Sequence, residues 1–284
     1  MKILVTGAKG QLGYDVIKEL NKRKIECLGV DKEDFDITDK TATMSFIELY
    51  RPSSVIHCAA YNLVDKAEEE KELCLKVNTD GTINVAEACR LCNAKMLHIS
   101  TDYVFDGKKE GLYEPYDTVN PLSVYGISKA KSEQGVQKVL EKYFIVRTSW
   151  LFGSSGQNFV KKMLMLSRMN KKINVVDDQV GSPTYTVDLA PLLVDIALSE
   201  KYGIFHATNE GFCSWADFAK AIFEFANIKC DVHRISGAEY PAKAVRPKNC
   251  RLSKSKLSEA GFDNLPPWEE ALKRYLKSEG FCMK

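Results

Sequence analysis

The stretch Lys2-Ile-Leu-Val-Thr-Gly7-Ala-Lys-Gly10-Gln-Leu-Gly13 decides the fold of this chain. It is a short apolar run that passes directly into three glycines and then into residues with helical periodicity. In such a strand-turn-helix unit the glycines make a tight turn, let the backbone approach a pyrophosphate, and let the helix pack on the strand. Free N–H groups at the N-terminus of the helix favour binding of the negatively charged pyrophosphate. The stretch predicts a dinucleotide site with contacts from Gly7, Gly10, Gln11, Leu12 and Gly13.

Short apolar runs alternate with helical segments through the N-terminal half of the chain. The alternation is typical of βαβ units and predicts an α/β fold: a doubly wound parallel sheet (Rossmann) with a smaller C-terminal substrate-binding lobe. Strands are expected at residues 2–6, 26–30, 54–58, 96–100, 144–148 and 173–176. Helices are expected at residues 10–22, 41–50, 70–92, 124–142, 159–167 and 187–198. Residues 1–152, with a returning segment 187–207, should form the NAD(P)-binding domain, and residues 153–186 and 208–284 the lobe.

Composition narrows the function classes. The chain has 284 residues, 27% charged and 45% hydrophobic, with a net charge of +2, which is ordinary for a globular protein and predicts no nucleic-acid partner. No apolar run is long enough to span a membrane, so we expect a cytoplasmic protein. Nine scattered cysteines favour reduced thiols, and the single C-x-x-C at Cys89 and Cys92 lacks a second pair for a metal. We expect no metal.

Acidic residues after the second strand bear on the cofactor. Asp31 ends that strand, where a carboxylate accepts hydrogen bonds from the adenosine ribose, which favours NAD. Lys32 and Lys9 are close enough in sequence to pair with a 2′-phosphate, so NADPH and NADH both remain open. Asp36-Ile37 is interpreted either as a step beside the adenine or as part of a helix N-cap sequence.

A tyrosine and a lysine four residues apart form the candidate catalytic pair. Tyr125 and Lys129 lie on one face of a predicted helix, where the ammonium would lower the phenol pKa so that the tyrosine exchanges protons with a carbonyl oxygen. Ser100 and Thr101 follow the fourth strand, where hydroxyls can hold that oxygen. Small residues after the third strand leave room for a dinucleotide, and Asn78 begins a helix where its amide could serve a proton relay.

These motifs together resemble the extended branch of the short-chain dehydrogenase/reductase family that acts on sugar nucleotides. The matching patterns are T-G-x-x-G-x-x-G at 6–13, N-x-x-G-T at 78–82 and Y-x-x-x-K at 125–129. Within that branch, S-T-D-Y-V-F-D-G at 100–107 and D-Q-V-G-S-P-T at 178–184 look like the dTDP-4-dehydrorhamnose reductases. The resemblance implies NAD(P)H-dependent reduction of the C4 ketone of dTDP-6-deoxy-L-lyxo-4-hexulose to dTDP-L-rhamnose.

The resemblance also implies roles for individual residues. Thr101 would orient the ketone, Tyr125 would donate the proton, and Lys129 would bind the nicotinamide ribose. Trp150 would form an apolar wall beside the sugar. The remaining candidate cofactor contacts are Asp31, Asp36, Ile37, Ala59, Ala60, Tyr61, Asn78 and Ser100. The remaining candidate substrate contacts are Asp102, Tyr103, Asn158, Gln179 and Arg246, the last three toward the nucleotide diphosphate.

Two departures from the family pattern and two rival functions stay open. The chain has Tyr61-Asn-Leu-Val-Asp65 where the family usually has a threonine, and Ser132-Glu133 where it usually has Gly-Glu. The rivals are a sugar-nucleotide epimerase or dehydratase of the same branch, and a non-catalytic NADP-binding regulatory subunit. Asp102 is followed by Tyr103 and not by a second carboxylate, which favours simple reduction. We expect a monomer rather than a dimer.

Overall fold

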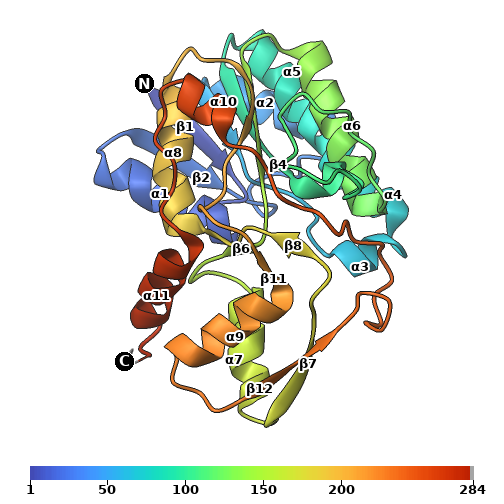
Figure 1. The fold of residues 1–284 in the computed structure, drawn as a ribbon. Helices are drawn as coiled ribbons and strands as arrows, with labels where there is room; N and C mark the ends of the chain where they lie inside the picture. Colours follow the sequence, from blue (N-terminus) through green and yellow to red (C-terminus); the bar gives the residue numbers. More distant parts are fainter. Residues whose placement is uncertain (282–284) are drawn as a thin grey trace.

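The computed structural model describes residues 1–281, and a six-stranded parallel sheet forms its centre. The strand order is β10-β5-β4-β3-β1-β2, so β1 lies next to the edge strand β2, and β3, β4, β5 and β10 follow in turn on its other side (Figure 1). The strands are β1 (Lys2–Thr6), β2 (Glu26–Val30), β3 (Ser54–His57), β4 (Lys95–Thr101), β5 (Tyr143–Thr148) and β10 (Gly203–His206). The predicted doubly wound α/β fold is confirmed.

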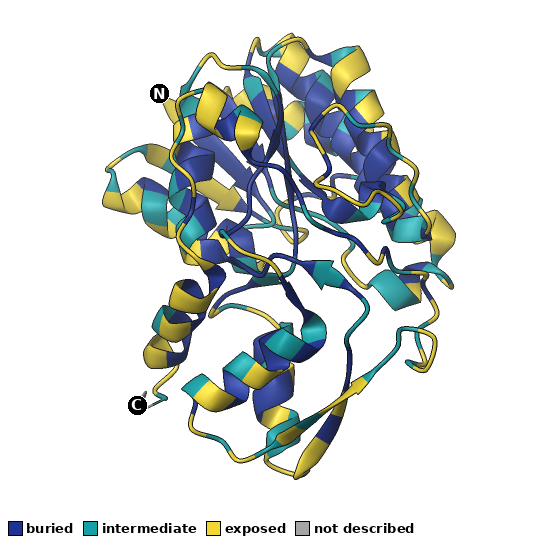
Figure 2. Ribbon diagram, viewed as in Figure 1, coloured by how far each residue is buried: buried dark blue, intermediate teal, exposed yellow. Residues whose placement is uncertain are grey.

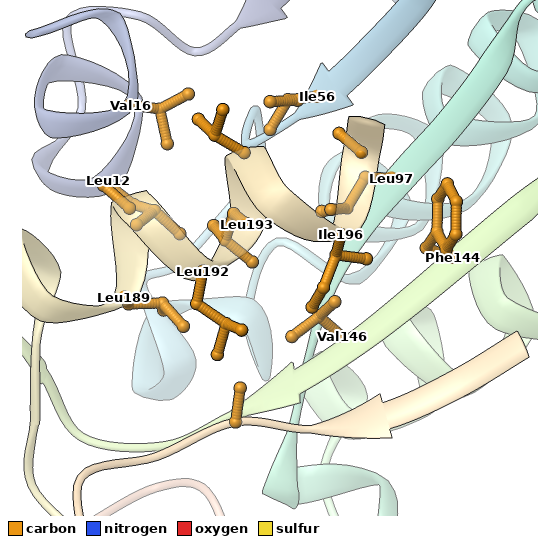
Figure 3. Close-up of a cluster of buried hydrophobic side chains, with 14 of the residues drawn as sticks. Leu12, Val16, Ile56, Leu97, Phe144, Val146, Leu189, Leu192, Leu193 and Ile196 are labelled. Atoms are coloured by element: carbon orange, nitrogen blue, oxygen red, sulfur yellow. The ribbon is translucent and has the colours of Figure 1, made fainter. Parts of the chain in front are cut away.

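Successive strand residues alternate between two cores, one on each face of the sheet. Ile3 and Val5 of β1 pack in one core, whereas Leu4 packs in the other. Figure 3 shows the first core, where α8 (Thr186–Leu198) and α1 (Gln11–Lys22) place Leu193 and Val16 against the sheet. The second core lies under α2 (Lys40–Tyr50), α5 (Thr82–Leu91) and α6 (Val124–Val139). Figure 2 shows this layering: most of the central strands are buried, and the helices that cover them are buried on one side and exposed on the other.

One predicted helix is divided. The segment expected as a single helix over residues 70–92 consists of α4 (Lys71–Leu75), a π-helical turn η1 (Lys76–Gly81) and α5, preceded by the short α3 (Val64–Ala67). π-helical turns are rare and occur most often at functional sites. Here the wider turn carries Asn78 and lets Gly81 approach Ile37, because a Cβ at Gly81 would lie 2.8 Å from that side chain.

The smaller lobe contains short strand pairs and three helices, drawn at the bottom of Figure 1. Its helices are α7 (Phe159–Ser167), α9 (Trp215–Phe225) and α11 (Trp268–Ser278). Its strand pairs are β7 (Lys172–Val176) with β12 (Asp231–Ile235), β8 (Val180–Gly181) with β11 (Cys213–Ser214), and β6 (Leu151–Phe152) with β9 (Thr184–Tyr185). These elements share one apolar core.

Two segments that follow residues of the lobe in sequence pack in the sheet domain. α8 and β10 lie in the sheet domain, where β10 pairs with β5, in the region expected to return. The short α10 (Ser255–Glu259), expected in the lobe, instead places Leu257 in the core of the sheet domain. Short helical periodicity does not reveal which core an apolar face will join. No helix within residues 1–281 is long and apolar enough to cross a membrane.

Candidate active site

Two cavities adjoin at the carboxyl ends of the parallel strands, where ligands bind in open α/β sheets. They share part of the glycine loop and the small residues after β3. The first cavity, of about 410 Å³, is lined by the candidates Gly7, Gly10, Asp31, Asp36, Ile37, Ala59 and Ala60. The second, of about 370 Å³, is lined by the candidates Gly7, Gly10, Gln11, Leu12, Gly13, Ala60, Ser100, Thr101, Asp102, Tyr103, Tyr125, Lys129 and Trp150.

The glycine loop has the geometry that a dinucleotide cradle requires. Gly7 has a φ of +69°, and a Cβ there would lie 2.7 Å from the backbone nitrogen of Ala59. A Cβ at Gly13 would lie 2.2 Å from the carbonyl oxygen of Gly7. α1 begins at Gln11 without a side-chain cap, so its first N–H groups remain available for a phosphate. The residues present therefore fit a dinucleotide across both cavities.

The far end of the first cavity suits an adenosine. Asp31 accepts hydrogen bonds from the backbone N–H groups of Lys9 and Lys32, which turns the chain beside the cavity. Asp39 is the N-cap of α2, as one interpretation of this segment expected, while Asp36 and Ile37 line the cavity and their place beside an adenine stays a prediction. The ammonium of Lys9 pairs with Glu33 at 2.9 Å. Lys32, the other lysine expected as a possible partner of a 2′-phosphate, is exposed and lines the cavity.

The candidate catalytic residues meet in the second cavity. Ser123 caps α6 by accepting from the N–H of Gly126, which fixes the first turn that carries Tyr125. Lys129 follows one turn later and is 2% exposed. Thr101, at the end of β4, donates its hydroxyl proton to Asp102 at 2.9 Å and accepts from the N–H of Tyr103. A hydroxyl, a phenol and an ammonium therefore border one space.

Burial dominates the electrostatics of this space. It raises the pKa of the Tyr125 phenol above its ordinary value, and Asp102 raises that pKa further, while hydrogen bonding with Thr101 lowers it. This corrects the expectation that Lys129 sets a low phenol pKa, because desolvation of the phenolate outweighs the other contributions. Burial also raises the pKa of Asp102 to about 6, and one of its carboxylate oxygens has no hydrogen-bond partner. Lys129 has its pKa lowered to about 8 by burial.

A buried ion pair beneath the cavity escaped sequence reasoning. Arg147 on β5 donates to both carboxylate oxygens of Glu133 on α6, at 2.9 and 2.6 Å. Both side chains are 3% exposed, and the Ser100 hydroxyl donates to the same carboxylate. The pair ties the end of the sheet to the helix that carries Tyr125 and Lys129. A charged residue inside each of two otherwise buried segments was the available signal.

Two tryptophans stack at the border between the sheet domain and the lobe. Trp150 has a left-handed backbone with φ of +50°, and its ring stacks on Trp215 with centroids 3.5 Å apart. Such a backbone is strained for a non-glycine residue and often marks a functional site. Trp215 covers one face of Trp150, so only the rest of that ring is presented to the cavity. Nothing in the sequence pattern singled out Trp215.

A further cavity of about 220 Å³ lies in the lobe. The candidates Gln179 and Arg246 line it together with Trp215, which also borders the second cavity. The Arg246 guanidinium pairs with both carboxylate oxygens of Asp65 on α3, at 3.1 and 2.7 Å. Asp65 also accepts from the backbone N–H of Ala244. The segment that contains Ala244 and Arg246 is thus held against the sheet domain.

Three candidates lie outside the cavities. The side chain of Asn78, which is fully buried, bonds the backbone N–H and C=O of Tyr61. Tyr61 donates its hydroxyl proton to Glu70. Asn158 caps α7 and donates to the side chain of Gln11. These polar groups satisfy buried backbone and support the site without lining it.

Metal ligands and paired cysteines do not gather in the described part of the chain. Within residues 1–281 there is no group of three or more His, Cys, Asp or Glu side chains that could hold a metal ion. Cys89 and Cys92 are both free thiols.

Comparison with known proteins identifies the family. A family model described as the RmlD substrate binding domain matches residues 1–280. The dTDP-4-dehydrorhamnose reductase of Aggregatibacter actinomycetemcomitans is 42% identical, over 96% of this chain and 97% of that protein. The dTDP-4-keto-6-deoxy-D-glucose reductase of Streptomyces niveus is 35% identical, over 95% and 94%. The crystal structure of dTDP-4-dehydrorhamnose reductase from Bacillus anthracis str. Ames in complex with NADP is 42% identical, with a TM-score of 0.95 over 98% and 99% of the two chains. The resemblance seen in the motifs is confirmed: this chain belongs to the RmlD substrate-binding-domain family.

Proposed function

We propose that this protein reduces the C4 ketone of dTDP-6-deoxy-L-lyxo-4-hexulose to dTDP-L-rhamnose with NADPH or NADH. The observation that carries the proposal is the meeting of Thr101, Tyr125 and Lys129 in a cavity that adjoins the glycine-loop cradle. Relatives named for this reaction align with the chain from end to end and support the choice of substrate.

The residues of the two cavities would hold the coenzyme, which supplies the hydride when bound. The glycine loop and the start of α1 would bind the pyrophosphate, and Asp31 the adenosine ribose. Lys129 would bind the hydroxyls of the other ribose. The buried Glu133–Arg147 pair would keep α6 at a fixed distance from β5, and so hold Tyr125 in place.

The protein's own chemical step is a proton transfer. Because burial raises the phenol pKa, Tyr125 is protonated at neutral pH and ready to act as an acid. Its O–H bond breaks as the proton passes to the ketone oxygen, and with the hydride on C4 the product is a secondary alcohol. The phenolate left behind shares the cavity with the Lys129 ammonium and must recover a proton before the next turnover. Thr101 would hold the ketone oxygen beside the phenol.

The lobe would bind the nucleotide of the substrate. Gln179 and Arg246 line a cavity that shares Trp215 with the cavity of Tyr125, so a substrate held at Tyr125 would extend its diphosphate toward them. Arg246 would give charge-assisted hydrogen bonds. A second candidate substrate is dTDP-4-keto-6-deoxy-D-glucose, because the Streptomyces niveus relative is named for its reduction.

We also propose the organisation and setting of the molecule. Residues 1–152 with 187–207 form the coenzyme-binding unit and the rest mainly the substrate lobe. The protein is a cytoplasmic monomer that binds a dTDP sugar and neither nucleic acid nor membrane. Light scattering of the purified protein coupled to size exclusion tests the monomer, and a dimer mass would contradict it.

The function is tested by coenzyme oxidation at 340 nm with the 4-keto sugar nucleotide generated in solution. Tyr125→Phe removes the proton donor and should lower kcat by about 10²–10⁴-fold with little change in coenzyme affinity. Tyr116→Phe is the matched control, because Tyr116 is 70% exposed and lies outside both cavities. Full turnover by Tyr125→Phe would refute the assigned donor. Coenzyme binding without turnover of any 4-keto sugar would favour a regulatory subunit.

A further inference from the structure

A histidine and a serine lie directly beneath Lys129. His98 on β4 and Ser132 on α6 are both 0% exposed. The Nε2 atom of His98 is 2.8 Å from the Ser132 hydroxyl oxygen and 3.5 Å from the Lys129 ammonium nitrogen. The Ser132 hydroxyl oxygen is also 2.7 Å from the Lys129 carbonyl oxygen. The proposed catalytic machinery assigns no role to either His98 or Ser132.

The hydrogen-bond inventory fixes which imidazole nitrogen carries the proton. A hydroxyl has one proton, and a carbonyl oxygen can only accept, so Ser132 donates to the Lys129 carbonyl. Its lone pair then faces His98, whose Nε2 must donate. The other ring nitrogen, Nδ1, is buried without a partner. A buried N–H without a partner is rare, so Nδ1 carries the lone pair. Both observations select the Nε2–H tautomer.

This tautomer denies Lys129 an acceptor. The Nε2 atom carries its proton toward Ser132, so it offers no lone pair to the Lys129 ammonium, which has three N–H groups to donate. The separation of 3.5 Å is at the outer limit of a hydrogen bond, as expected for two groups that both donate. Burial lowers the pKa of His98 well below its ordinary value, so the imidazole stays neutral over the working pH range.

We propose that Ser132 and His98 are positioning residues that hold Lys129 near the balance between its ammonium and amine forms. Ser132 does so by fixing the His98 tautomer, and His98 by offering the Lys129 ammonium no lone pair at Nε2. Lys129 can then release and recover a proton near neutral pH, which would let it recharge the Tyr125 phenolate. This last consequence rests on the proposed reduction, whereas the tautomer and the lysine titration do not.

Other groups around Lys129 also act on its pKa, some raising it and some lowering it. Glu133, one turn further along α6, raises the Lys129 pKa, and the Cys58 and Cys74 thiols do so more weakly, whereas burial lowers it to about 8. His57 stacks on His98 with ring centroids 5.6 Å apart and is itself kept neutral by burial, which lowers its pKa to about 3. The hydroxyl of Ser132 is a part of this environment that can be removed without touching a charge.

The tautomer is tested by ¹⁵N NMR of protein labelled at its four histidines. A protonated and an unprotonated ring nitrogen have well separated ¹⁵N shifts, and the His98 signals are those displaced in Ser132→Ala. We expect Nε2–H in the wild type. Nδ1–H would overturn the proposal. The experiment needs no substrate, so its failure is distinct from a failure of the proposed function.

The effect on Lys129 is tested by titration. The His98 ¹⁵N shift should report the lysine ionisation near pH 8, and in Ser132→Ala this step should move up by roughly 0.5–1 pH unit, because His98 becomes free to accept from the ammonium. The high-pH limb of kcat should move with it, while kcat at pH 7 stays within about twofold. Ser167→Ala removes a similar serine-to-carbonyl bond in α7 and should move neither. Superimposable wild-type and Ser132→Ala titrations would overturn the proposal.

Discussion

Replacing Asp102 with Asn should stabilise the protein. Asp102 is 2% exposed, and one carboxylate oxygen lacks any hydrogen-bond partner. Burial raises its pKa from 3.8 to about 6, so the folded state disfavours the ionised form that the unfolded state allows. A shift of about two pKa units corresponds to about 3 kcal/mol. An amide of the same shape removes this cost and still accepts from Thr101.

The sign and the pH window follow from the direction of the shift. Because the folded pKa is raised, the wild type loses stability as the pH increases from about 4 through about 6, and the loss is complete above about pH 7. The gain from Asp102→Asn should therefore be about 1–3 kcal/mol at pH 8, where an unpaired amide N–H offsets part of it. At pH 5 the gain should be smaller by about 1–1.5 kcal/mol.

Urea unfolding of wild type and Asp102→Asn at pH 5 and pH 8 measures both quantities. Asp106→Asn is the contrasting control. Asp106 accepts from Tyr113 and Asn120, and these and backbone bonds lower its pKa, so its replacement should destabilise at pH 8. An Asp102→Asn protein less stable than the wild type at pH 8, or a difference that does not vary with pH, would refute the reasoning.

Three further changes test other parts of the site. Gly13→Ala should abolish coenzyme binding, measured by fluorescence titration, because its Cβ would lie 2.2 Å from the Gly7 carbonyl oxygen; retained affinity would contradict the cradle. Glu133→Gln should cost about 3–5 kcal/mol in urea unfolding, because Arg147 is left buried without a counter-charge; a loss below about 1 kcal/mol would argue against the pair. Lys32→Ala should weaken NADPH binding about tenfold and leave NADH binding unchanged, since only NADPH has the 2′-phosphate; equal effects on both would exclude Lys32 as the phosphate partner.

Local patterns were sufficient for the elements that build the cradle. The predicted strands at 2–6 and 26–30 coincide with β1 and β2, and the apolar run before Gly7 leads directly into α1. Tyr125 and Lys129 share a helix face because their spacing alone places them there. Asn78 shows the limit of such reasoning: its motif was visible, but neither the π-helical turn that carries it nor its hydrogen bonds to the backbone of Tyr61 could be expected from it.

The amino-acid sequence by itself determined the α/β class, the dinucleotide loop and the residue types at the reacting centre, because each rests on periodicity or spacing within a few residues. Only the tertiary structure decided that Glu133 meets Arg147, that Trp215 covers Trp150, and that α10 packs in the sheet domain. It also decided the charge states. A phenol or carboxyl takes its pKa from the water that surrounding elements exclude, and those elements lie far away along the chain.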